Sequence, residues 1–146
     1  MSRPILFAVL LSLAAACGGD LGPEPNLTGN EDPDATVFLA ESELPAGYMD
    51  ALFQGRVVRD AQGCLRLESA QPATVIWPVG STLESRDGAL YVKDGAGREL
   101  AKIGAVTSFG GGYVPSHDYA NLSARDRSLA QTRCPGEYWL AGPAPR

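Results

Sequence analysis

The chain has few of the side chains that perform most enzyme chemistry. His117 is its single histidine, so any mechanism that uses histidine as a general base depends on that residue. Zinc sites usually take several Cys or His ligands, and this chain offers one histidine and three cysteines, two of which we expect to be oxidised. No Gly-x-Ser-x-Gly nucleophile elbow and no Cys-x-x-Cys redox motif occurs. We therefore predict no metal site and no cofactor, and we assign no catalytic residue.

Two patterns leave catalysis open as an alternative. Ser116, His117 and Asp118 are the residue types of a hydrolytic triad, but consecutive side chains cannot stack as nucleophile, base and orienting acid. His117 would have to reach a distant serine and aspartate, and a polar loop histidine is the simpler interpretation. A pair of carboxylates is the other route to hydrolysis, and the 17 acidic residues do not single out one pair.

Positive charge and long apolar runs are also scarce. The chain has 12 Lys and Arg against 17 Asp and Glu, and its net charge is −5. This sign opposes binding to nucleic-acid phosphates and to anionic lipid headgroups, so we expect neither as a partner. A membrane-spanning helix needs roughly 20 apolar residues, and the longest apolar run, near the N-terminus, spans only about a dozen.

That run has the features of a cleaved export signal. Arg3 precedes the apolar stretch 5–13, and three alanines then lead to Cys17. The run Ala15-Ala16-Cys17 resembles the bacterial lipoprotein lipobox, although Ala14 stands where that motif usually has Leu. The resemblance implies removal of residues 1–16, acylation of Cys17 with chains such as palmitate, and an extracytoplasmic, lipid-anchored protein of the bacterial envelope. Ordinary signal peptidase acting at the same bond would instead give a secreted protein.

The remaining cysteines predict a disulfide. If Cys17 is lipidated, Cys64 and Cys134 are left as one pair in an oxidising compartment. A bridge between them closes a loop of 70 residues (134 minus 64), for which chain entropy predicts roughly 4 kcal/mol of stabilisation. The alternative is two separate buried thiols.

Composition divides the mature chain into two parts. Residues 17–36 are rich in Gly, Pro and acid, with almost nothing apolar to bury, and we expect a flexible acidic tether. The acidic run 31–34 lacks the spacing of a calcium loop. Residues 37–146 form the expected β-barrel domain, with its core at 51–142.

Short apolar segments separated by turn residues predict an all-β domain. We expect one short helix and leave segment 37–49 open as strand or helical turn. The expected strands are 51–59 with a bulge or bend at Gly55, 64–68, 74–77, 90–93, 99–108 and 138–140; the turns are 60–63 and 94–97, the triple glycine 110–112 is a break, and the helix is 121–131.

Five or six short strands suit a small closed or partly closed barrel. Five short motifs occur in order along the chain: Gly63-Cys64-Leu65, Ile76-Trp77-Pro78, Asp94-Gly95, Gly110-Gly111-Gly112 and Cys134-Pro135-Gly136-Glu137-Tyr138-Trp139. This set resembles a group of largely uncharacterised bacterial lipoproteins, over roughly residues 51–142, and the resemblance implies an OB-like β-barrel domain. The helix near the last strand departs from the usual OB arrangement, so an unrelated small barrel is the alternative.

Two aromatic groups are candidates for binding. The first is a glycine-rich loop flanked by aromatics, Phe109-Gly110-Gly111-Gly112-Tyr113, for which a wide turn at a barrel corner is the simpler interpretation. The second is Trp77 with Tyr138 and Trp139, for which core packing is the simpler interpretation.

Three functions fit these observations. We expect a non-catalytic, lipid-anchored module that binds an envelope protein or another envelope component. The alternatives are a small-ligand or glycan binder that uses residues 109–113, and an envelope hydrolase with a carboxylate site.

Overall fold

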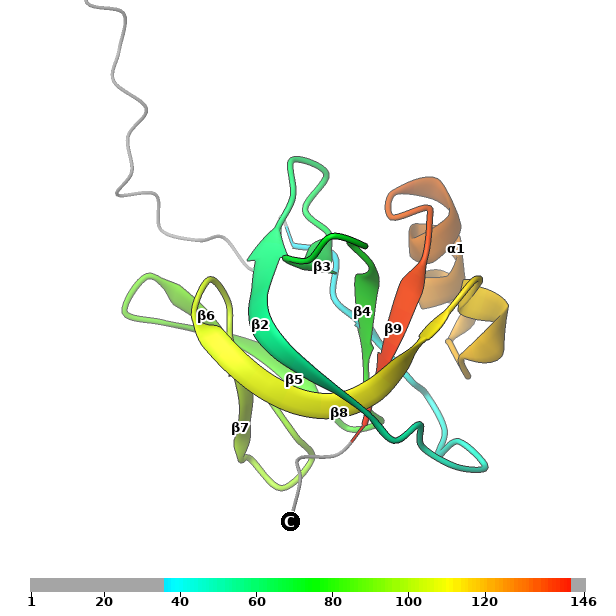
Figure 1. Cartoon of the computed structure of the whole chain (residues 1–146), viewed down its shortest axis with the longest axis horizontal. Helices are drawn as coiled ribbons and strands as arrows, with labels where there is room; N and C mark the ends of the chain where they lie inside the picture. The colour runs from blue at the N-terminus through cyan, green and yellow to red at the C-terminus, as the bar shows by residue number, and fades with distance from the viewer. Residues whose placement is uncertain (1–35, 143–146) are drawn as a thin grey trace, which may run out of the picture.

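The structure, a computed structural model, describes residues 36–142 of the chain, and its core is a closed five-stranded barrel (Figure 1). The order around the barrel is β4-β3-β2-β8-β9, and parallel pairing of β4 with β9 closes it. These strands are β2 (Ala51–Arg59), β3 (Leu65–Leu67), β4 (Thr74–Trp77), β8 (Val106–Val114) and β9 (Tyr138–Ala141). The prediction of an all-β, OB-like barrel is confirmed.

An extra strand answers the question left open for segment 37–49. Strand β1 (Leu39–Ala40) runs parallel to β4, with Leu39 opposite Ile76 and Ala40 opposite Trp77. Residues 42–49 then form an irregular connection that reaches β2 beside the end of β8 (Figure 1, cyan to teal). The segment is therefore a short strand followed by a loop, and not a helix.

A separate antiparallel sheet is inserted between β4 and β8. The predicted hairpin at 94–97 is confirmed, because the Asp94 carboxylate accepts hydrogen bonds from the backbone of Ala96 and Arg98. The single strand predicted over 99–108 is wrong, since a turn at 103–105 separates β7 from β8. The inserted strands are β5 (Thr82–Arg86), which the sequence did not predict, β6 (Ala89–Lys93) and β7 (Glu99–Lys102).

The one α-helix among residues 36–142 is α1 (Ala124–Thr132), and it lies in the connection between β8 and β9, as expected near the last strand. Its first turn is capped by Ser123, whose hydroxyl accepts a hydrogen bond from the Asp126 backbone N–H at 3.1 Å. Ala130 is completely buried in a cluster with Ile76 and Tyr138 on the outer side of β4 and β9, and Leu129 is partly buried beside it. The helix therefore packs through a small apolar face.

Aromatic side chains fill the barrel interior. The Phe109 ring lies 5.3 Å from both Phe53 and Trp77, and Phe53 also contacts Trp139 at 6.1 Å between ring centroids. Each such side chain contributes about 1.5–3 kcal/mol by leaving water. Trp77, Tyr138 and Trp139 are all at most 3% exposed, so they pack in the core and line no cleft.

The bulge predicted at Gly55 is wrong, and the bend that was its alternative stays a prediction. Strand β2 pairs with β8 in continuous register from Ala51 to Arg56. A Cβ at Gly55 would lie 2.9 Å from the Phe53 ring, so the glycine gives that ring its space. The sequence analysis singled out Gly55, and the structure explains the glycine by the packing of the Phe53 side chain against it.

Candidate functional site

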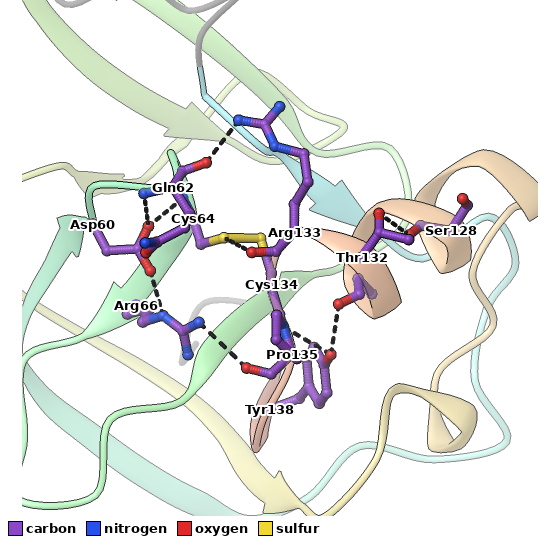
Figure 2. The surroundings of a disulfide bond; sticks show 11 residues. Asp60, Gln62, Cys64, Arg66, Ser128, Thr132, Arg133, Cys134, Pro135 and Tyr138 are labelled. Atoms are coloured by element: carbon purple, nitrogen blue, oxygen red, sulfur yellow. Dashed lines mark hydrogen bonds and ion pairs between the residues drawn. A yellow bond between two sulfur atoms is a disulfide. The ribbon is translucent and has the colours of Figure 1, made fainter.

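The predicted disulfide is present and ties helix α1 to the barrel. Figure 2 shows Cys64, immediately before β3, bonded to Cys134, which follows the helix; their Cα atoms are 5.8 Å apart. The Tyr138 hydroxyl donates to the backbone oxygens of Cys134 at 2.8 Å and Ala130 at 3.1 Å. Burial raises the pKa of this phenol. The bridge is therefore embedded in a buried framework.

Asp60 organises the loop on the other side of the disulfide. Its carboxylate accepts hydrogen bonds from the backbone of Gln62 and Cys64, and from the Arg66 guanidinium at 2.6 Å (Figure 2). Partial burial alone would raise the pKa of Asp60, but Arg66 and the two N–H groups together hold it below its ordinary value of 3.8. This network is fully paired, so we assign it to loop rigidity.

The glycine-rich segment 109–113 is not a loop. All five residues lie inside strand β8, so the predicted break at 110–112 is wrong and the candidate binding segment is a strand, not a loop. Phe109 is 1% exposed and points into the core. A Cβ at Gly111 would overlap the Leu140 carbonyl and the Trp139 indole. Gly111 is needed because the backbone of Leu140 and the indole of Trp139 approach the strand closely.

Tyr113 is the one aromatic of this segment that reaches the surface. Its ring stacks edge-on against Trp139 at 4.9 Å, and its hydroxyl donates to the Gln71 backbone oxygen at 3.0 Å. The side chain is 37% exposed. The Tyr113 hydroxyl also lies 3.4 Å from that of Ser69, so three contacts hold this side chain.

The structure shows an exposed apolar surface that the sequence analysis missed. We call it the 44–52 patch, and it consists of Leu44, Tyr48, Met49 and Leu52, which are 73%, 40%, 45% and 66% exposed. Three of the four lie in the connection whose structure the sequence left open. The sequence did carry a signal for this surface: four large apolar residues fall within nine positions, and their spacing follows neither the helical nor the strand period.

The 44–52 patch lies on the outer face of β8, over the glycines. Leu52 is opposite Gly110 in the β2–β8 register, and the Met49 side chain occupies the space that a Cβ on Gly112 would take. Alternate residues of a strand share one face, so Leu52, paired beside Gly110, and Met49, packed on Gly112, lie on the same side of the sheet. These two patch residues therefore form one surface with Gly110 and Gly112.

Glu41 lies beneath this surface and is the one buried carboxylate among residues 36–142. It is 5% exposed, and its Oε1 has no hydrogen-bond partner within the described chain. Burial raises the pKa of this carboxyl, and a hydrogen bond from the Asn121 backbone partly offsets the rise. A small cavity of about 20 Å³ adjoins it, lined by Pro45, Gly47, Tyr48, Met49, Leu140 and Ala141.

His117 is buried rather than solvated, which corrects the expected polar loop histidine. It lies in a short 3₁₀ helix, η2 (His117–Tyr119), with its ring 5.7 Å from that of Tyr138. Ser116 donates its hydroxyl hydrogen bond to Asp118, and His117 Nε2 is 3.5 Å from that carboxylate without hydrogen-bond geometry. The three residues do not form a nucleophile–base–acid line.

A second hollow, of about 510 Å³, lies between the start of the described chain, β5 and α1. Arg125 and Arg133 line it, and Arg133 also donates to the Gln62 backbone oxygen at 2.7 Å. Ser81 lines it too, and its hydroxyl oxygen is buried with no hydrogen-bond partner within the described residues. We call this the arginine hollow.

Three further observations concern the described residues 36–142 as a whole. They contain no group of three or more His, Cys, Asp or Glu side chains arranged to hold a metal ion. No helix among them has the length and apolarity required to cross a membrane. The predicted signal at 1–16, the predicted lipidation site Cys17 and nearly all of the predicted tether at 17–36 lie outside the described residues.

Comparison with family models, with curated proteins and with solved structures gives no match to this chain.

Proposed function

We propose that this protein is a lipid-anchored, extracytoplasmic module of a bacterial envelope that binds another protein and catalyses no reaction. The lipobox-like sequence at Cys17 supports the anchor. The disulfide supports an oxidising compartment, because such bonds persist mainly in exported proteins. Release as a secreted protein is the alternative, and mass spectrometry of the N-terminal peptide distinguishes the two by the acyl mass on Cys17.

The 44–52 patch is the observation that carries the binding function. Four large apolar side chains are exposed within one segment of nine residues, and their contact with water raises the free energy relative to burial. Clustered exposed apolar residues usually mark interaction sites, and aromatic and Met side chains are enriched at such interfaces. The strand below is well paired to β2 and β9, so the patch has a rigid support.

Site-specific photo-crosslinking tests this proposal. A photoreactive residue at position 52 of the full-length protein, in its own envelope, should give one reproducible protein adduct. The matched control places the same residue at position 99, an exposed site on the separate sheet. The adduct should disappear when Tyr48→Glu is added. Equal adducts at both positions, or no adduct at position 52, would contradict the proposal.

A second candidate function is the capture of a small anionic ligand in the arginine hollow. Guanidinium groups recognise carboxylates and phosphates through paired hydrogen bonds, and Arg125 and Arg133 both line this hollow. The unpaired Ser81 hydroxyl is a further donor. Calorimetric titration with inorganic phosphate should show binding that Arg125→Leu removes and that Arg56→Leu, an exposed change on β2, leaves unchanged. Equal binding by both variants would count against this function.

A further inference from the structure

The position of Glu41 is maintained by backbone contacts from two sides. Its N–H donates to the Trp77 backbone oxygen at 2.9 Å, and it forms an antiparallel bridge with Leu122. The Asn121 backbone hydrogen-bonds to the carboxylate, which leaves Oε1 unpaired within the described residues. A buried acceptor without a partner costs about 1–3 kcal/mol, and more when it is charged. The fold thus holds a buried carboxylate with one oxygen, Oε1, that lacks a donor.

The adjoining cavity limits the size of any donor. Its volume is about 20 Å³, and a water-sized group needs roughly 10–15 Å³ on the same measure. An ammonium group is compact and carries three donors, whereas a guanidinium is a wide planar fork. The cavity therefore admits an ammonium group and excludes a guanidinium.

Local charge favours a cation over an anion. Residues 41–55 include Glu41, Glu43 and Asp50 but no Lys, Arg or His. The cavity walls include Tyr48 and Met49, which also belong to the 44–52 patch. The aliphatic stem of a lysine can pack along such side chains while its head enters a polar site. Anionic lipid would instead be repelled.

We propose that Glu41 is the receptor for a lysine ammonium of a partner protein docked on the 44–52 patch. This inference rests on the proposed function and names the chemistry of the partner. The lysine must be flanked by apolar residues, because the surface around the cavity is apolar. Pairing with the ammonium supplies the donor that Oε1 lacks.

Fluorescence anisotropy with short labelled peptides tests the inference on the full-length protein purified in detergent. The probe is acetyl-Leu-Lys-Leu-amide, and matched peptides carry arginine or norleucine in place of the lysine. Glu41→Gln removes the charge while keeping the side-chain shape. Glu99→Gln, on the separate sheet, is the control for net charge.

The lysine peptide should bind the wild type and the Glu99→Gln variant with equal affinity. It should bind the Glu41→Gln variant at least tenfold more weakly. The arginine and norleucine peptides should bind the wild type at least tenfold more weakly than the lysine peptide does. Carbon-13 NMR should also show that the lysine peptide lowers the pKa of Glu41. Equal binding of the lysine peptide to wild type and Glu41→Gln, equal binding of the arginine peptide, or no binding at all would overturn the inference.

Failure of this inference is distinguishable from failure of the proposed function. If Glu41→Gln leaves binding unchanged and the position-52 crosslink persists, the 44–52 patch binds a partner without lysine recognition. If the crosslink is also absent, both proposals fail.

Discussion

Glu41 makes a testable contribution to stability, apart from any partner. Glu41→Gln should raise the free energy of unfolding by an amount on the order of 1 kcal/mol at any pH above the folded-state pKa of Glu41, because it removes a buried charge with an unpaired oxygen. Burial raises the folded-state pKa above the ordinary 4.5, so the destabilisation is complete above the folded pKa and disappears as the pH falls to 4.5. Urea unfolding across this range should show the two proteins converging at low pH. A constant difference would contradict the assignment.

Gly111 tests why the barrel needs a glycine in β8. Gly111→Ala should destabilise the protein by about 3 kcal/mol, because its Cβ would overlap the Leu140 carbonyl and the Trp139 indole and because its φ of +149° is one that L side chains rarely adopt. Gly97→Ala is the control: its φ of +79° is unfavourable for alanine, but nothing lies within 4 Å of the added carbon. That change should cost about 1 kcal/mol. Thermal unfolding that shows equal losses would assign the effect to backbone conformation instead.

Single residues also show where sequence reasoning succeeds and fails. Leu65 and Leu67 were expected to share a face, and both are buried, because alternation in a strand is a local property. The glycines at 110–112 were expected to break a strand and instead lie within one. Composition alone does not distinguish a loop glycine from one required by a neighbour distant in sequence. Glu41 was missed for the same reason, since its burial depends on residues from β4 and β9.

Among the elements, helix α1 depends on its N-terminal cap. Ser123→Ala should lower the free energy of unfolding by about 1 kcal/mol, because the hydroxyl acceptor for the Asp126 N–H is lost. Ser128→Ala, at an exposed position within the same helix, should leave stability unchanged or slightly raised. Circular dichroism during urea unfolding measures both. An equal loss in the two variants would show that the cap is not the cause.

The strands that were predicted well are those with clear local signals. β2 matches its predicted bounds, and the 94–97 hairpin has the Asp-Gly turn that favours tight reversal. β5 was missed because its residues are mostly exposed and carry no apolar alternation. β7 and β8 were merged because both have strand-like composition, and the turn between them is marked only by Gly104 at φ +82°.

For the molecule as a whole, the disulfide is the main covalent constraint on the described domain. Replacing both Cys64 and Cys134 with Ala should lower the free energy of unfolding by roughly 4 kcal/mol, from the entropy of a 70-residue loop. Urea unfolding with and without reductant measures this. Reductant should destabilise the wild type and leave the double variant unchanged. The estimate would be contradicted if full reduction of the disulfide left the free energy of unfolding of the wild type unchanged.

The anchor prediction, the class of fold and the cysteine pairing all came from the chain alone. Each depends on composition or on spacing along the sequence: an apolar run before Cys17, short alternating segments between turns, and two cysteines left in an exported chain. The disulfide and the OB-like barrel are confirmed, and the anchor stays a prediction. The binding surface depends instead on contacts between distant segments. Only folding brings the 42–50 connection over the β8 glycines and buries Glu41 beneath it, because closure of the barrel places β9 and β4 beside that connection.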